Sequence, residues 1–327
     1  MTSRVHVLGV SNAIVDVLAH VDDDFLTHIG AEKRTMTLID EQRATEVYEK
    51  MGPAVEMSGG SVANTIAGLA NLGGSAAYIG RVADDQLGRI FIHDLESLGV
   101  DVRLAPSNHG APTARSHILI TPDGQRTMQT YLGACMELGL DDVNEHTIGD
   151  PEVILLEGYA WDIPQGPALA LEAMKVAERN GSFVGLSLSD AGCVERHRDA
   201  FFDALTRHAR MVFANEREII SLFDVETFDD ALDRTSDFDA LFVLTRTEKG
   251  CVVIDGDETI VQPAYPVDEV IDATGAGDAH TAAFLYQWTT GRSLTACADL
   301  ASRCATAMIR QVGGRLDQHA LSRLSPA

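Results

Sequence analysis

The sequence has few lysines, and its cysteines form no motif. The five cysteines, at positions 135, 193, 251, 297 and 304, are an odd number. None of them forms a Cys-x-x-Cys pair, so neither a redox motif nor a zinc knuckle is indicated, and we interpret all five as core residues. Few candidates exist for lysine-dependent chemistry such as Schiff-base formation, because the 327 residues include only Lys33, Lys50, Lys175 and Lys249.

Positive charge is also scarce. The chain has 25 Lys and Arg against 49 Asp and Glu, a formal net charge of −24. Such a surface repels nucleic acids and anionic membranes, so we expect neither as a partner. The sequence shows no apolar run of about 18 residues and no apolar leader, and we therefore expect a reduced, cytoplasmic protein. An anionic small molecule would need local donors such as helix N-termini.

Several nucleotide and hydrolase motifs are missing. No Gly-Lys dipeptide occurs, so a Walker A loop is excluded, and no G-x-G-x-x-G follows the first apolar strand. The H-E-x-x-H and G-x-S-x-G patterns of zinc proteases and serine hydrolases are absent as well. What remains is an ordinary globular composition, 45% hydrophobic and 23% charged, with enough apolar residues for a large core.

Short apolar strands alternate with amphipathic helices along most of the chain. This alternation predicts an α/β fold with a mostly parallel sheet covered by helices on both faces. A hairpin is expected at 251–262. Strands are expected at 5–10, 76–79, 153–159, 182–188, 211–215 and 240–245, and helices at 59–73, 87–98, 167–179, 195–208, 216–223, 277–289 and 294–311.

One region has a different pattern. Two β-type runs, 115–120 and 126–131, flank Thr121-Pro122-Asp123-Gly124-Gln125, which is a turn signal. Their alternation predicts a hairpin in a sheet with one exposed face. We expect this hairpin to form a small separate β-sheet from segments of about 12–40 and 110–132, attached to one domain that spans 1–327.

The strongest chemical signal is the run from Asp272 to Asp278, Asp-Ala-Thr-Gly-Ala-Gly-Asp, which leads into an apolar helix. Small residues before a helix leave backbone N–H groups open to a phosphate, and the helix dipole favours an anion there. Asp278 falls in the first turn and suits the role of proton acceptor for a hydroxyl that attacks the phosphate. The alternative is a glycine loop with an acidic residue at a helix N-terminus.

A second glycine pair lies at the start of another expected helix. Gly59 and Gly60 let the backbone approach a ligand, and Asn64 in the first turn can both donate and accept hydrogen bonds. The alternative is an N-cap at Ser58 or Ser61 with Asn64 on the helix surface.

Together the two stretches resemble the two signatures of the ribokinase-like (PfkB) family of sugar and nucleoside kinases. The first signature runs from Gly59 through Asn64, Gly73 and Arg81 to Gly88, and the second from Asp272 to Asp278. Two departures are Ala273, where the family usually has a small hydroxyl residue, and His280, where an aromatic is common. The resemblance implies a ribokinase-like α/β fold with a β lid, and phosphoryl transfer from MgATP to a primary hydroxyl.

The resemblance also assigns roles around the reacting groups. Asp278 corresponds to the catalytic base, and the amides of Gly275, Ala276 and Gly277 correspond to the anion hole. The segment from Val10 to Asp16 matches the family's early Gly-Asn-x-x-x-Asp pattern. The implied contacts to the sugar hydroxyls are those of Asn12, Asp16, Gly59, Gly60, Ser61 and Asn64.

On the nucleotide side, Asn215 and Glu218 match the family's Asn-x-x-Glu motif, which arranges water around Mg²⁺. The same pair also fits a helix capping box, and both readings can hold. Arg246 either reaches the nucleotide phosphates or is a solvated loop charge. The resemblance allows K⁺ as a further cation, and it implies ATP contacts from Thr245, Arg246, Gly250, Thr274, Ala305 and Ile309.

The acceptor is expected to be adenosine, since the opening Asn12-to-Asp16 segment and the run 126–134 are closer to the adenosine kinase branch. Arg126 either meets phosphates when the lid closes or is a surface arginine. An apolar slot for the base would be formed by Ile14, Met128, Leu132 and Tyr159. The alternatives are a kinase for ribose, fructose or a related sugar, an inactive ligand-binding sensor on the same fold, and, more distantly, a dinucleotide oxidoreductase. A homodimer through the lid is a further expectation.

Overall fold

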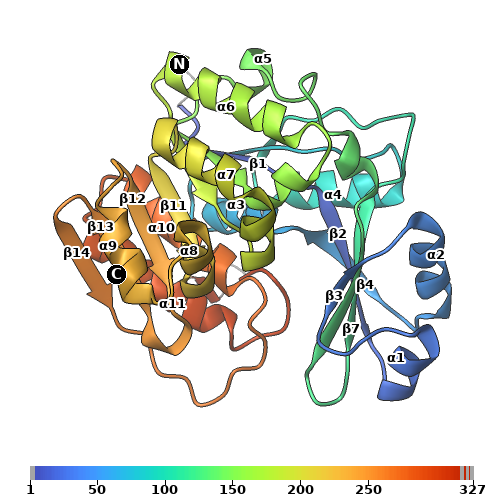
Figure 1. Ribbon diagram of the computed structural model, residues 1–327. Coiled ribbons are helices and arrows are strands. Elements are labelled where there is room, and N and C mark those ends of the chain that lie inside the picture. Colours follow the sequence, from blue (N-terminus) through green and yellow to red (C-terminus); the bar gives the residue numbers. More distant parts are fainter. Residues whose placement is uncertain (1–3, 317–319, 322–323, 325–327) are drawn as a thin grey trace.

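Two β-sheets organise the chain, as Figure 1 shows for the computed structural model, which describes residues 4–316, 320–321 and 324. The larger sheet has nine strands in the order β14-β13-β12-β11-β10-β9-β1-β5-β6. All its neighbours pair in parallel except β12–β13 and β13–β14. Its strands are β1 (Val7–Val10), β5 (Ala76–Ile79), β6 (Asp101–Val102), β9 (Val153–Glu157), β10 (Phe183–Ser187), β11 (Met211–Asn215), β12 (Leu241–Thr245), β13 (Cys251–Asp255) and β14 (Glu258–Gln262).

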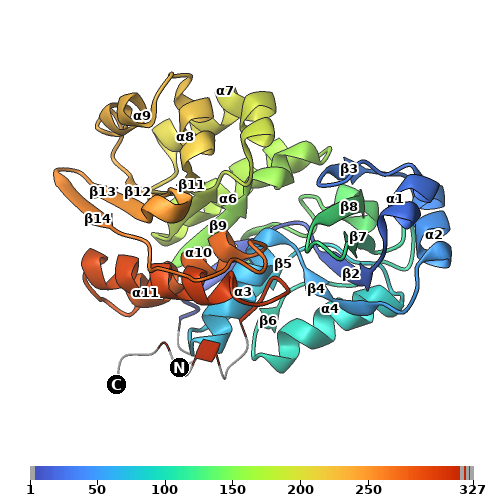
Figure 2. The same ribbon diagram turned by 90° about the horizontal axis from the view of Figure 1, so that it is seen from below.

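Helices cover both faces of this sheet (Figure 2). A hydrophobic core lies on each face of the sheet. Side chains alternate along a strand, so Leu8 and Val10 of β1 belong to one core and Val7 to the other. The first face packs against α6 (Gly166–Asn180), α7 (Ala191–Arg207), α8 (Glu216–Phe223) and α9 (Phe228–Thr235). The second packs against α3 (Ser61–Asn71), α4 (Gln86–Ser97), α10 (Ala276–Thr289) and α11 (Leu294–Met308).

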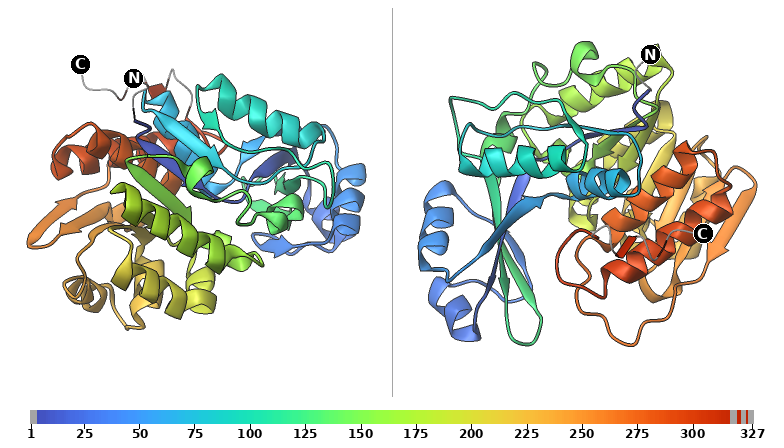
Figure 3. Two further views of the ribbon diagram at one scale, coloured as in Figure 1. Left: turned by 90° about the horizontal axis from the view of Figure 1, so that it is seen from above. Right: turned by 180° about the vertical axis from the view of Figure 1, so that it is seen from behind.

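The second sheet stands to one side of the large domain (Figure 3) and is called the lid. Its strand order is β3-β8-β7-β2-β4. Two helices cover its outer face, where Leu26, Ile29 and Val47 pack on Leu119. The lid consists of β2 (Ile14–His20), α1 (Asp23–Ile29), β3 (Met36–Leu38), α2 (Glu41–Lys50), β4 (Val55–Gly59), β7 (Ala114–Ile120) and β8 (Arg126–Tyr131).

The predicted α/β architecture is confirmed, as are the hairpins and the burial of the five free cysteines. The expectation of one exposed face is wrong for β7, whose residues are all buried except Arg115, because β7 is an interior strand and α2 packs on it. The sequence interpretation missed α1, α2, α9 and β4, and β4 places lid residues beyond the expected segment of about 12–40. The short helices are α5 (Glu145–Ile148), η1 (Gly133–Glu137), η2 (Gly158–Asp162) and η3 (Thr247–Lys249).

Among the described residues, no helix combines the length and the apolar character that a membrane span requires.

Candidate active site

The carboxyl ends of four parallel strands point to one edge of the large sheet. Beyond or at these ends lie Asn12 after β1, Glu157 of β9, Asn215 of β11 and Thr245 of β12. Ligands of open α/β sheets bind at this edge, because the loops that follow the strands gather there. The helices α3 and α10 begin at the same edge and bring in the two glycine-rich stretches.

The two stretches meet at Asp278. The Ser61 hydroxyl donates to Asp278 Oδ1 at 2.6 Å, and Asn64 Nδ2 donates to Oδ2 at 3.2 Å. The structure therefore brings together residues more than 200 positions apart that the sequence assigned to one site. Burial raises the pKa of Asp278 to about 6, although both hydrogen bonds and the charge of Arg315 oppose the shift. The carboxylate is thus ionised at neutral pH and able to accept a proton.

The loop before Asp278 has the geometry of an anion site. Gly275 is the N-cap of α10 with φ 73°, and a Cβ there would lie 2.4 Å from the Gly314 carbonyl oxygen, so only glycine fits. A Cβ on Gly277, in contrast, would meet no atom within 4 Å. The first turn of α10 therefore lies beside open space at Gly277, while Ala276 N donates to the Ala273 carbonyl at 3.3 Å.

A cavity of about 230 Å³ lies against this turn. It joins the expected base to the expected Mg²⁺ residues and to two serines, Ser187 and Ser189, that the sequence interpretation missed. The predicted residues in its wall are Ser61, Asn215, Glu218, Thr245, Gly277 and Asp278.

Asn215 and Glu218 form a capping box at the start of α8. The Asn215 side chain accepts from the N–H groups of Arg217 and Glu218, and Glu218 Oε2 accepts from Asn215 N at 2.9 Å. Burial raises the pKa of Glu218 to about 7, the charge of Asp190 adds to the shift, and among the described residues no cation opposes it. A buried carboxylate that lacks a positive partner suits Mg²⁺. Because Asn215 already engages both Glu218 oxygens, the residues fit an ion held through water.

Asp16 lies on the lid strand β2, directly over Gly59. A Cβ on Gly59 would stand 2.3 Å from Asp16 Oδ2, so the carboxylate occupies the place of a side chain there. Burial raises the pKa of Asp16 to about 7, with Arg315 and Arg126 opposing and Asp278 adding to the shift. The candidate diol contact and the candidate base therefore lie within electrostatic reach of each other.

Glu157 is a buried acid that the sequence interpretation missed. Its Oε2 accepts from Asn12 N at 3.0 Å and its Oε1 from Val62 N at 3.4 Å. Burial raises its pKa to about 7, against these hydrogen bonds. Glu157 ties the loop after β1 to the start of α3, which fixes Asn12 beside Gly60. Its only sequence signal is an acid that ends a fully apolar strand.

Strand register places two of the four residues expected to form an apolar slot, Ile14 and Met128, on one face of the lid. Asp16 pairs with Ser116 and Ser116 with Thr130, so Ile14 and Asp16 share a face with Arg126 and Met128. Ile14 and Met128 are partly exposed. Leu132 and Tyr159, which follow β8 and β9, are partly exposed as well.

Arg126 crosses from the lid to the loop before α10. Its Nη1 donates to Thr274 Oγ1 at 2.6 Å, and its Nη2 forms an ion pair with Asp272. Both members of the pair are largely buried. Arg126 is therefore a contact between lid and large domain and not a free surface arginine.

The predicted nucleotide residues fall into two groups. Thr245 lines the cavity, and Ile309 accepts backbone hydrogen bonds from Ile271 and Asp272 through its carbonyl, one turn after Ala305. Arg246 is instead paired with Glu216 at 3.2 Å and stacked on Phe228 with 4.1 Å to the ring centroid. The structure thus gives Arg246 a local partner, and Gly250 lies where a Cβ would meet the Gln262 carbonyl at 2.0 Å.

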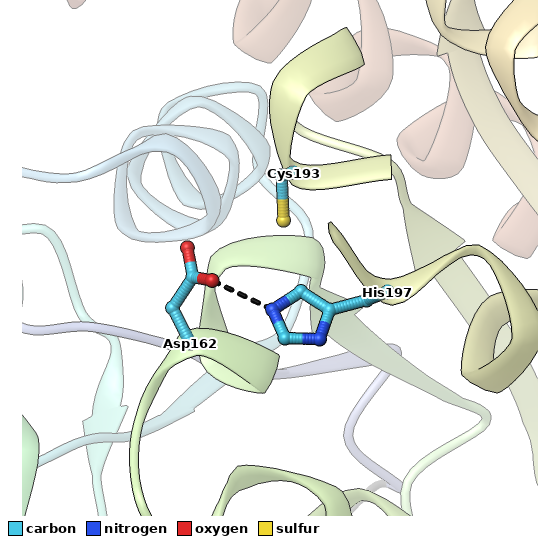
Figure 4. Close-up of side chains that lie close together, drawn as sticks. All are labelled: Asp162, Cys193 and His197. Atoms are coloured by element: carbon cyan, nitrogen blue, oxygen red, sulfur yellow. Dashed lines mark hydrogen bonds and ion pairs between the residues drawn. The ribbon is translucent and has the colours of Figure 1, made fainter. Parts of the chain in front are cut away.

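A cluster of potential metal ligands, Asp162, Cys193 and His197, lies outside this cavity (Figure 4). His197 Nε2 and Asp162 Oδ1 are 2.6 Å apart, and Arg196 forms a two-bond ion pair with the same carboxylate. Burial raises the pKa of the Cys193 thiol to about 12, so it stays protonated at neutral pH. Through these contacts the cluster links α7 to η2, the short helix that contains Tyr159.

The fold and this arrangement define a kinase that transfers a phosphoryl group to an alcohol. The family model described as pfkB family carbohydrate kinase matches residues 27–321, and the chain belongs to this family of ATP-dependent kinases. Family membership implies ATP and Mg²⁺.

Solved structures similar to the chain carry two different names. An adenosine kinase from Sinorhizobium meliloti is 43% identical, with a TM-score of 0.90 over 98% of this chain and 99% of that one. A probable sugar kinase from Rhizobium etli CFN 42 has the same identity and TM-score, over 98% of each chain. An ATP-dependent ribose-1-phosphate kinase from Halopiger xanaduensis is 30% identical over 261 residues, 80% of this chain and 83% of its own length.

Proposed function

We propose that the protein transfers the γ-phosphoryl group of ATP to the 5′-hydroxyl of adenosine. Asp278 accepts the hydroxyl proton while that oxygen bonds to the γ-phosphorus, and the bond to the β,γ-bridging oxygen breaks to release ADP. The N–H groups of Gly275, Ala276 and Gly277 stabilise the charge on the transferred group. The products are AMP and ADP.

The observation that carries the nucleoside assignment is the shared inner face of the lid. Asp16 provides one carboxylate that accepts from two neighbouring ribose hydroxyls. Ile14 lies on the same face of β2, and Met128 lies on that face of β8, on the other side of β7. A nucleoside needs such an apolar surface next to its diol contact, whereas a free sugar would leave these side chains against water. The similarity to the Sinorhizobium meliloti adenosine kinase supports the same assignment.

Magnesium would be held through water by Glu218, with Asn215 fixing the carboxylate. When bound, the ion neutralises charge on the ATP phosphates and so favours attack by the hydroxyl oxygen. Dependence on K⁺ and a homodimer through the lid stay predictions. Rates measured with and without K⁺, and the mass in solution, test them.

A sugar kinase is the second candidate. The Rhizobium etli and Halopiger xanaduensis relatives favour it, and so does the charge near Asp16, where Arg126 and Arg315 both contribute. Two guanidinium groups beside an acceptor site suit a sugar that already bears a phosphate.

The deciding experiment compares kcat/KM for adenosine, inosine, guanosine, ribose, fructose and ribose 1-phosphate at equal MgATP. We expect adenosine to have the highest value. Preference for a free sugar or for ribose 1-phosphate would contradict the nucleoside assignment and leave the phosphoryl-transfer chemistry intact. Failure of every acceptor, with an intact melting transition, would direct the search to other alcohols.

A further inference from the structure

Arg315 comes from the far end of the chain and reaches the centre of the candidate site. It follows α11, and its Nε donates to Asn64 Oδ1 at 2.9 Å while its Nη1 donates to Ser58 Oγ at 2.6 Å. The loop before it packs on the anion site, since Gly313 N donates to Asp272 Oδ2 at 3.0 Å. The side-chain contacts of Arg315 and the backbone contact of the preceding loop thus fix the position of this guanidinium.

The contact with Asn64 determines which way the Asn64 amide faces. A guanidinium has five donors and no acceptor, so it can approach only the oxygen end of an amide. Because Arg315 takes Asn64 Oδ1, the NH₂ end must face Asp278, to which it donates at 3.2 Å. The opposite orientation would set Oδ1 against the Asp278 carboxylate and Nδ2 against the guanidinium, and both contacts would be repulsive.

Arg315 also supplies charge where several acids are buried together. The Arg315 guanidinium interacts electrostatically with Asp16 of β2, Asp94 of α4 and Asp278 of α10. Arg126 of β8 adds a second positive charge near Asp16. Glu157 of β9 places a further negative charge near Asp278. Among the described residues, Arg315 Nη2 is buried and has no hydrogen-bond partner, so this nitrogen remains free to donate to a ligand.

We propose that Arg315 is a positioning residue for phosphoryl transfer, which acts through Asn64 by turning its amide donor toward Asp278. The ionised form of Asp278 then accepts two hydrogen bonds, one from Ser61 and one from Asn64. This inference deepens the proposed function and rests on Asp278 being the base. It does not depend on which alcohol is the acceptor.

A double-mutant cycle tests whether Arg315 acts on Asp278 through Asn64. Arg315→Met, Asn64→Ala and the double variant are compared with the wild type, using the best acceptor from the substrate comparison. We expect Arg315→Met to lower kcat about 10- to 100-fold and to change the KM for ATP little. In the Asn64→Ala background the same substitution should change kcat less than about threefold, because its target is already gone. Additive losses would overturn the proposal.

The pH profile separates positioning from mere structural support. Loss of the donor and of the positive charge raises the pKa of Asp278, so the acid limb of the kcat/KM profile should move to higher pH in Arg315→Met. Arg315→Lys keeps a charged donor and should restore part of the rate and of the profile. If Arg315→Met folds and the acid limb of its kcat/KM profile does not shift, the proposed action of Arg315 through Asn64 is contradicted. If Arg315→Met does not fold, the pH profile is measured on Arg315→Lys instead.

The matched control is Arg103→Met. Arg103 is likewise a partly buried arginine, which donates to the carbonyls of Thr147 and Ile148 at the end of α5 and does not line the candidate cavity. It should lower the melting temperature without moving the pH profile. Asp278→Asn is measured alongside. If that variant keeps its rate, the base assignment fails, whereas a large loss there with a normal Arg315→Met refutes only the role of Arg315.

Discussion

At the scale of single residues, the site must keep Asp278 ionised although burial favours its neutral form. Hydrogen bonds from Ser61 and Asn64 and the charge of Arg315 oppose the effect of burial on its pKa. The Asp278 carboxylate in turn raises the pKa values of Asp16 and Glu157. The balance leaves the pKa of Asp278 near 6, which suits a base that works around neutral pH.

Asp278→Asn should therefore lower kcat about 10²- to 10⁴-fold, because an amide cannot accept the hydroxyl proton. The side chain keeps its shape and still accepts from Ser61, so the KM values should stay within a few-fold. Steady-state kinetics with MgATP and the best acceptor check this. Retention of more than about half the wild-type kcat would show that another group is the base.

Glu218→Gln separates the two roles of that residue. If Glu218 orders water around Mg²⁺, kcat should fall and be partly restored by higher Mg²⁺. If it is only a cap, stability should drop by about 1 kcal/mol with unchanged kinetics. The control is Asp230→Asn in the capping box of α9, which lies on a different helix and should affect stability alone.

At the scale of elements, the sequence predicts best where local rules decide. The glycines before two apolar runs predict helices from 59 and 277, and the structure starts α3 at Ser61 and α10 at Ala276, within two residues of those positions. The helix α2 was missed because most of its ten residues are polar, although Asp40 caps its first turn. Arg315 could not be found in this way, because its partner Asn64 lies 251 residues away and no local pattern encodes that contact.

Gly277→Val tests the first turn of α10 as an anion site. Because a Cβ there would meet no atom within 4 Å, the variant should fold, and its side chain should instead fill the space of the phosphoryl group. We expect turnover to fall at least 100-fold with a melting temperature close to that of the wild type. Gly52→Val, at another open position, is the control. Normal turnover in a folded Gly277→Val would remove the anion site from the mechanism.

At the scale of the whole molecule, four acids of the candidate site have raised pKa values. Asp16, Glu157 and Glu218 have pKa values of about 7, and Asp278 about 6, all raised by burial. The chain as a whole carries a net charge of −24. Burial thus opposes ionisation of all four acids at neutral pH, and a bound cation would favour their ionised forms.

This arrangement predicts how stability depends on pH. Between the unfolded pKa of about 4 and the folded pKa of about 7, the folded chain binds more protons than the unfolded chain, so the free energy of unfolding falls as pH rises. The melting temperature without ligands should therefore decrease from about pH 5 to about pH 8. Asp16→Asn removes one such acid. It should melt above the wild type at pH 8, and the difference should shrink toward pH 5, where the wild-type carboxyl group is protonated.

The control for this prediction has the opposite sign. Asp123, in the lid turn, is paired with Lys33 at 2.8 Å, and hydrogen bonds from Lys33 and Thr121 hold its pKa below the usual range. Asp123→Asn should therefore melt at or below the wild type at pH 8, because it loses a favourable partner and relieves no strain. A destabilised Asp16→Asn at pH 8 would mean that Arg315 and Arg126 stabilise the Asp16 carboxylate more than burial disfavours it. Asp16 would then be ionised and paired before any acceptor arrives.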